Sequence, residues 1–143
     1  MKRIASLVVI VVSLSLAGCA SGPKYADISS TISDVAPEKG RLYIYRKAVV
    51  GAAVQPEVRV NDDVVGKAEP KGFFYIDRDP GSYKVETSTE VDRALSLTLE
   101  AGETRYVRLN IGIGFFVGHV YPELVDNETG MEEIQACSYT GGQ

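Results

Sequence analysis

Apolar and polar residues alternate along most of the chain from position 40 onward. Leu42 and Ile44 alternate with Tyr43 and Tyr45, and a period of two predicts a β-strand. The same alternation predicts further strands at 58–60, 64–68, 73–77, 83–87, 95–99, 107–111 and 119–125. Residues 131–137 fit either a last strand or a short helix, and we expect the strand.

Turn-forming residues separate these segments. Residues 61–63, 79–82 and 126–130 are rich in Asn, Asp, Pro and Gly. Pro80-Gly81 suits a type II turn with a positive φ at Gly81, which predicts a hairpin between 73–77 and 83–87. Many short strands with such turns predict an all-β domain, a single antiparallel β-sandwich of about 7–9 strands in two packed sheets.

The first residues follow a different pattern. Lys2 and Arg3 precede an apolar run at 4–16, which as a helix would span about 20 Å of a bilayer core of about 30 Å. A basic start, a short apolar segment and small residues behind it are typical of a secretory signal. A buried core helix or an uncleaved anchor are the alternatives.

The end of this segment, Leu16-Ala17-Gly18-Cys19, resembles the lipobox of bacterial lipoproteins. The resemblance implies cleavage before Cys19 and acyl chains on Cys19, which would hold the protein to a membrane. More than one acyl chain on the same residue is sufficient for stable anchoring. Ala20 follows the cysteine, and the resemblance then favours the outer membrane, on its periplasmic side, within the cell envelope.

We therefore expect a signal peptide at 1–18, a lipidated cysteine and tether at 19–39, the β-sandwich at 40–138 and a frayed end at 139–143. The tether is rich in Ser, Gly and Pro. Apolar residues spaced by three and four predict one or two helical turns that dock partly on the domain; they are Tyr25, Ile28, Ile32 and Val35.

The net charge and the number of cysteines limit which binding partners and disulfides we expect. Removing 18 of 143 residues leaves 125, and the removed part carries two positive charges and no acidic residue, so the net charge changes from −4 to −6. This sign disfavours a nucleic-acid partner. If Cys19 is acylated, Cys137 has no intrachain partner, and we expect a buried thiol rather than an intermolecular disulfide.

Few residues suggest chemistry. His119 is the only histidine, so no histidine-based metal cluster can form, and no Gly-x-Ser-x-Gly nucleophile elbow occurs. We expect no enzyme activity, no metal and no cofactor. Aromatic residues are the remaining candidates, because neighbours in a strand point to opposite faces. Phe74, Phe116, Tyr43 and Tyr45 form a candidate interaction surface, unless residues 25–35 cover them or they pair across strands.

Several segments, in order, resemble the bacterial domain-of-unknown-function family 2846. They are 40–46, 72–77, 80–83, 99–104, 106–108, 114–118, 123–126 and 128–130. The family consists largely of uncharacterised lipoproteins and secreted proteins, and its pattern is similar to small β-sandwich modules of the PEGA and carboxypeptidase-regulatory kind. The resemblance implies a fold and a location but no activity. We expect a lipid-anchored, non-catalytic interaction or structural module with an envelope protein partner, or alternatively a recognition module for a small ligand or glycan.

Overall fold

A computed structural model describes residues 18–113 and 118–142 of the chain. Over these residues it contains nine strands, two α-helices and one 3₁₀ turn. The elements, in chain order, are α1 (Tyr25–Ile28), η2 (Ser29–Thr31), β1 (Gly40–Arg46), β2 (Glu57–Val60), β3 (Asp63–Lys67), β4 (Gly72–Arg78), β5 (Gly81–Thr87), β6 (Glu90–Leu99), β7 (Thr104–Ile113), β8 (Gly118–Val125), α2 (Asn127–Ile134) and β9 (Ser138–Tyr139).

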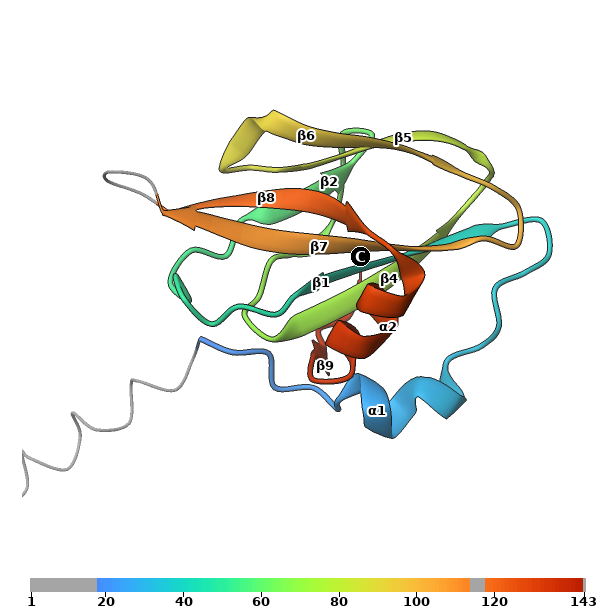
Figure 1. The fold of residues 1–143 in the computed structure, drawn as a ribbon, viewed down its shortest axis with the longest axis horizontal. Helices are drawn as coiled ribbons and strands as arrows, with labels where there is room; N and C mark the ends of the chain where they lie inside the picture. The colour runs from blue at the N-terminus through green and yellow to red at the C-terminus, as the bar shows by residue number, and fades with distance from the viewer. Residues whose placement is uncertain (1–17, 114–117, 143) are drawn as a thin grey trace, which may run out of the picture.

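The strands form two sheets that face each other (Figure 1), so the predicted all-β, two-sheet fold is confirmed. The strand order is β8-β7-β1-β4-β9 in the first sheet and β3-β2-β5-β6 in the second. The first sheet is mixed rather than antiparallel, because β1 runs parallel to β7 and β4 runs parallel to β9. The second sheet is antiparallel throughout.

The predicted hairpin at 79–82 is wrong. β4 and β5 belong to different sheets, so Asp79 and Pro80 carry the chain from one sheet to the other. Gly81 starts β5 without a positive φ, and the turn is therefore not type II. The hairpin between β2 and β3 does form, and Asn61 and Asp62 turn it with φ angles of 49° and 73°.

The predicted strand at 131–137 is also wrong, because α2 occupies most of it. Asp126 begins the helix as its N-cap, and its carboxylate accepts hydrogen bonds from the Thr129 amide and hydroxyl, both at 2.8 Å. The chain end is ordered further than predicted. Tyr139 lies in β9, and the Thr140 amide donates to Phe73 O at 2.9 Å.

The main core fills the space between the sheets. Alternate residues of β1, Leu42 and Ile44, point into it and meet aliphatic residues of the second sheet. Its other buried members include Val58, Val60, Phe74, Ile76, Val85, Leu97, Leu99, Val107, Leu109 and Val120.

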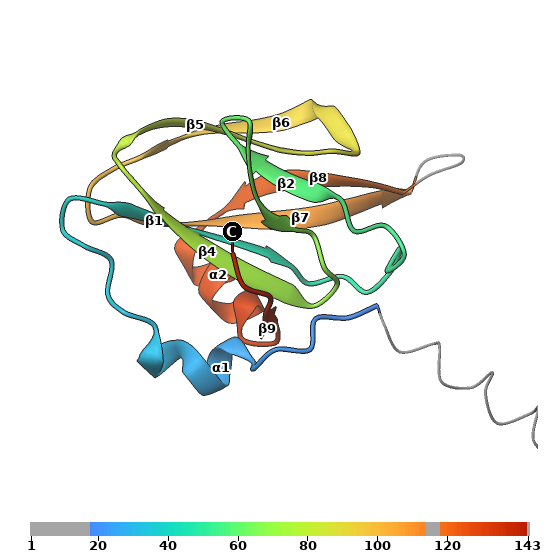
Figure 2. The same ribbon diagram turned by 180° about the vertical axis from the view of Figure 1, so that it is seen from behind.

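A second, aromatic cluster lies on the outer face of the first sheet. There α2 and the segment containing α1 and η2 cover the sheet (Figures 1 and 2). The predicted helical turns at 25–35 are confirmed, and Tyr25, Ile28 and Ile32 dock on this face. Because β1 is covered on both faces, all seven of its residues are buried.

Candidate functional site

Cys19, the predicted lipidation residue, is exposed and lies immediately next to the folded domain. The amide of Ala20 donates to Pro70 O at 3.0 Å, in the loop before β4. Residues 23–25 are then hydrogen-bonded to the chain end: Tyr139 N donates to Pro23 O at 2.8 Å and Tyr25 N to Cys137 O at 2.9 Å. The 19–39 segment is therefore docked, and it leaves almost no slack between Cys19 and the sandwich.

The predicted aromatic interaction surface is wrong for three of its four residues. Tyr43 and Tyr45 are 5% and 0% exposed in the outer aromatic cluster, and Phe74 is 1% exposed in the core between the sheets. Phe116 lies outside the described residues. The alternative that residues 25–35 cover the rings is correct for Tyr43, because Tyr25 packs edge-on against its ring at 5.8 Å and 84°.

Arg41 ties the N-terminal segment to the sheet. Its guanidinium forms a bidentate pair with Asp77, through Nε at 2.7 Å and Nη2 at 2.8 Å, and Nη1 donates to Ser33 O at 2.8 Å. It also lies 4.4 Å from the centre of the Tyr75 ring. The hydrogen bond to Asp77 raises the pKa of Arg41. Arg41 has a structural role, because its guanidinium nitrogens already donate hydrogen bonds to Asp77 and Ser33 O.

A cleft of about 380 Å³ remains between the N-terminal segment and α2. Tyr43 and Tyr106 line this cleft and stack on each other, with ring centres 5.2 Å apart and nearly parallel planes, and burial raises the pKa of Tyr106 to about 12. Ser29, Thr104 and Asn127 add polar groups at the sides. The cleft can therefore offer hydrogen bonds above aromatic rings, but no buried charged group points into it without a partner.

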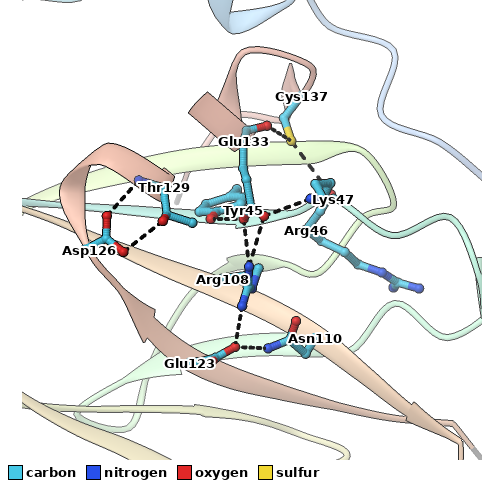
Figure 3. Close-up of polar contacts among 10 residues, drawn as sticks. All are labelled: Tyr45, Arg46, Lys47, Arg108, Asn110, Glu123, Asp126, Thr129, Glu133 and Cys137. Atoms are coloured by element: carbon cyan, nitrogen blue, oxygen red, sulfur yellow. Dashed lines mark hydrogen bonds and ion pairs between the residues drawn. The ribbon is translucent and has the colours of Figure 1, made fainter. Parts of the chain in front are cut away.

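Glu133 of α2 is the centre of a charged network on the same sheet face (Figure 3). Its carboxylate accepts from Tyr45 Oη at 2.6 Å, from Lys47 Nζ at 2.8 Å and from Arg108 Nη1 at 3.0 Å. Arg108 also pairs with Glu123 at 2.8 Å.

The hydrogen bonds of this network favour the ionised form of Glu133. Burial alone would raise the pKa of Glu133, but the hydrogen bonds from Lys47, Tyr45 and Arg108 outweigh it and leave that pKa below its ordinary value. Burial and the bond to Glu133 raise the pKa of Tyr45. Sequence reasoning missed Glu133 because it placed this segment in a strand.

Arg46, at the end of β1, holds the loop that follows it. The side chain is fully buried, and in Figure 3 its guanidinium points away from Cys137 and α2. It donates to four backbone oxygens: those of Val50, Gly51, Val54 and Ala68, at 2.6–3.0 Å. Burial lowers the pKa of Arg46. Sequence reasoning placed Arg46 only as the boundary of a strand, and no pattern in the sequence revealed this role.

The two remaining candidates have structural settings. Cys137 is fully buried beside Arg46 O and Glu133 O, so the expected buried thiol is confirmed, and burial raises its pKa to about 11. His119 lies in β8, with Nδ1 3.0 Å from the carbonyl oxygen of Thr89 in the turn between β5 and β6, and so helps to join the two sheets. Across residues 18–113 and 118–142, no metal-binding group of acidic, cysteine and histidine side chains occurs. No helix in that part of the chain is long and apolar enough to span a membrane.

Comparisons with known proteins identify relatives but no activity. Residues 36–120 match the family model described as "Protein of unknown function (DUF2846)". An uncharacterized protein of Haemophilus influenzae is 33% identical over 131 residues, which cover 88% of this chain and 78% of that protein. No solved structure matches the chain significantly.

Proposed function

Since this chain belongs to the DUF2846 family, whose description names no activity, we propose its function from its anchor and its architecture. The protein is a lipid-anchored lipoprotein of the cell envelope, held in the outer membrane on its periplasmic side. Its β-sandwich, a module of the PEGA-like kind, serves as a non-catalytic interaction or structural module.

The observation that carries this proposal is the placement of Cys19. The cysteine ends a sequence that resembles a lipobox, and its side chain is exposed, so that acyl chains can be attached without disturbing the core. From Ala20 onward the chain is hydrogen-bonded to the domain. Of the residues that the structure describes, cleavage before Cys19 would remove only Gly18, whose carbonyl oxygen accepts a hydrogen bond from Gln55 Nε2 at 2.9 Å.

The charged groups support a structural rather than a catalytic role. Arg41 holds the N-terminal segment through Asp77 and Ser33 O, and Glu133 holds α2 against the sheet through three donors. A catalytic acid commonly has a pKa raised towards neutrality, whereas that of Glu133 is lowered. These groups stabilise the docking of the two segments that cover the aromatic cluster.

The alternative function, recognition of a ligand or glycan by an exposed aromatic face, has no support from Tyr43, Tyr45 and Phe74, because all three side chains are buried.

The test is to follow the anchor in cells. The full chain is expressed in a bacterium with two membranes, the membranes are separated, and the amino-terminal peptide is examined by mass spectrometry. We expect an acylated Cys19 as the first residue and recovery in the outer membrane. The variant Cys19→Ala should leave that fraction, whereas Cys137→Ala, which changes the buried cysteine, should not. An unmodified amino terminus, or unchanged fractionation of Cys19→Ala, would refute the proposal.

A further inference from the structure

Cys19 lies at one end of the sandwich, and that end has a distinctive loop. We call residues 47–56, between β1 and β2, the anchor loop. In both views it lies at the same end as the start of the described chain (Figures 1 and 2). Distances agree: a Cβ placed on Gly18 would be 3.4 Å from Ala52 Cβ, and Ala20 is hydrogen-bonded to Pro70. Whatever membrane holds Cys19 must therefore come close to the anchor loop.

The anchor loop exposes two large apolar side chains to solvent. Val49 and Val50 are 46% and 62% exposed. They are consecutive, whereas the other exposed large hydrophobic side chains among the described residues, Val64 at 37% and Met131 at 54%, are isolated in sequence. Neighbouring exposed apolar side chains are typical of a contact surface for protein or membrane.

This exposure is held in place by the fold. Arg46 donates to the backbone oxygens of Val50, Gly51 and Val54, and Val54 N donates to Gly51 O at 2.9 Å. The guanidinium thus fixes the loop from inside. Val49 and Val50 project from a rigid support rather than from a segment that could fold back onto the core.

Positive charge flanks the two valines. Arg46 is opposite Gly72 in the sheet, so Lys47 and Lys71 are neighbours, and both line a cavity of about 270 Å³ together with Arg108. The anchor loop itself contains no acidic residue. The turn at 100–103, by contrast, contains Glu100 and Glu103, and Figure 1 places it at the opposite end of the sandwich. Lys71 therefore lies beside the anchor, together with Lys47, whose ammonium is paired with Glu133 at 2.8 Å.

We propose that the anchor loop is a membrane-contacting surface: Val49 and Val50 enter the interfacial layer of the membrane that holds Cys19, while Lys71 contacts lipid phosphates. The inference rests on the proposed lipid anchor and adds the orientation of the domain on its membrane. Apolar side chains with adjacent lysines are the combination that binds anionic lipid surfaces. With Cys19 fastened at the same end, even weak contacts are sufficient, because the acyl chains keep the loop at the surface.

The test places a polarity-sensitive fluorophore at each end of the molecule. Val50→Cys labels the anchor loop, and Ala101→Cys labels the exposed turn between β6 and β7 at the opposite end. Acylation blocks Cys19 and burial protects Cys137, so only the introduced thiol reacts. The acylated protein is reconstituted in vesicles of phosphatidylethanolamine and phosphatidylglycerol, after mass spectrometry has confirmed the acyl chains.

We expect the label at position 50 to shift to shorter wavelength and to be quenched by nitroxide-bearing lipids, while the label at position 101 stays in water. In detergent-free vesicles of neutral phosphatidylcholine, the quenching at position 50 should weaken. Equal water exposure at the two positions in confirmed acylated protein would overturn the orientation while leaving the anchor intact. Shielding at position 50 without lipid quenching would also overturn it, because a protein or a second copy would then cover the loop. Absence of acyl chains would refute the proposed function itself, and the inference with it.

Discussion

Replacing Phe74 by alanine tests the assignment of this ring to the core. Phe74 lies on β4 opposite Ile44 of β1, and its ring reaches across to the second sheet, where a Cβ on Gly66 would be 2.8 Å from two of its atoms. The backbone of β3 thus packs directly against the ring. Phe74→Ala would leave a cavity there, and we expect a loss of unfolding free energy of about 3–5 kcal/mol.

That loss is large for a domain of this size. Domains commonly have unfolding free energies of about 5–15 kcal/mol, and urea m values are about 1–3 kcal/mol per molar. With an m value of about 2 kcal/mol per molar, the urea midpoint should fall by roughly 2 M. The assay is urea unfolding of the mature chain with Cys19→Ala, followed by circular dichroism and by the fluorescence of its tyrosines, since the chain has no tryptophan.

Val64→Ala is the matched control, because Val64 lies on β3, beside Gly66, but is exposed. It should change the unfolding free energy by no more than about 0.5 kcal/mol. If Phe74→Ala costs less than about 1 kcal/mol, the ring is not packed between the sheets, and the buried assignment of the aromatic residues is refuted.

Two further predictions concern α2. The pKa of Glu133 is lower in the folded chain than the value of about 4.3 expected in the unfolded chain. The ionised carboxylate therefore stabilises the fold above about pH 4.3, and this stabilisation is lost as the pH falls through the folded pKa. Glu133→Gln should therefore lower the unfolding free energy by about 1–3 kcal/mol at pH 7. It should also weaken the dependence of that free energy on pH in the acid range, measured by urea unfolding at several pH values. An unchanged pH dependence would contradict the role of Glu133. Gly130→Ala should cost about 1–3 kcal/mol despite the better helix propensity of alanine, because its Cβ would overlap the Tyr106 ring. Glu132→Ala, on the exposed side of α2, serves as the control, and equal stability of the two alanine variants would show that the helix does not pack this closely.

The alternation of residues predicted most strands but not their partners. Leu42 and Ile44 face the core, as the alternation of residues predicts. The alternation does not indicate which strand pairs with β1, and the parallel pairing of β1 with β7 could not be predicted from it. Pairing is decided by packing between segments distant in sequence. For the same reason Pro80-Gly81 was assigned to a hairpin, although the chain there crosses between sheets.

The helix α2 and the side chain of Arg46 differ in whether the sequence could have predicted them. Asp126 followed by Thr129 is a usable N-cap signal, and Met131 and Ile134 are spaced as on a helix, so α2 could have been predicted from the sequence. Glu133 would then have been placed on the face of the helix that meets the sheet. The role of Arg46 could not have been predicted, because its four acceptors are backbone oxygens, which leave no trace in side-chain patterns.

The contacts of residues 23–25 with residues 137–139 have a consequence for the proposed export of the chain. Tyr25 bonds to Cys137, Pro23 bonds to Tyr139, and Lys24 forms a bridge with Ser138. In a chain exported from its amino terminus, residues 23–25 would cross the membrane more than a hundred residues before their partners at 137–139. The segment behind Cys19 would then become fixed only after those partners have crossed, and the lipid could be attached before this segment is docked on the domain.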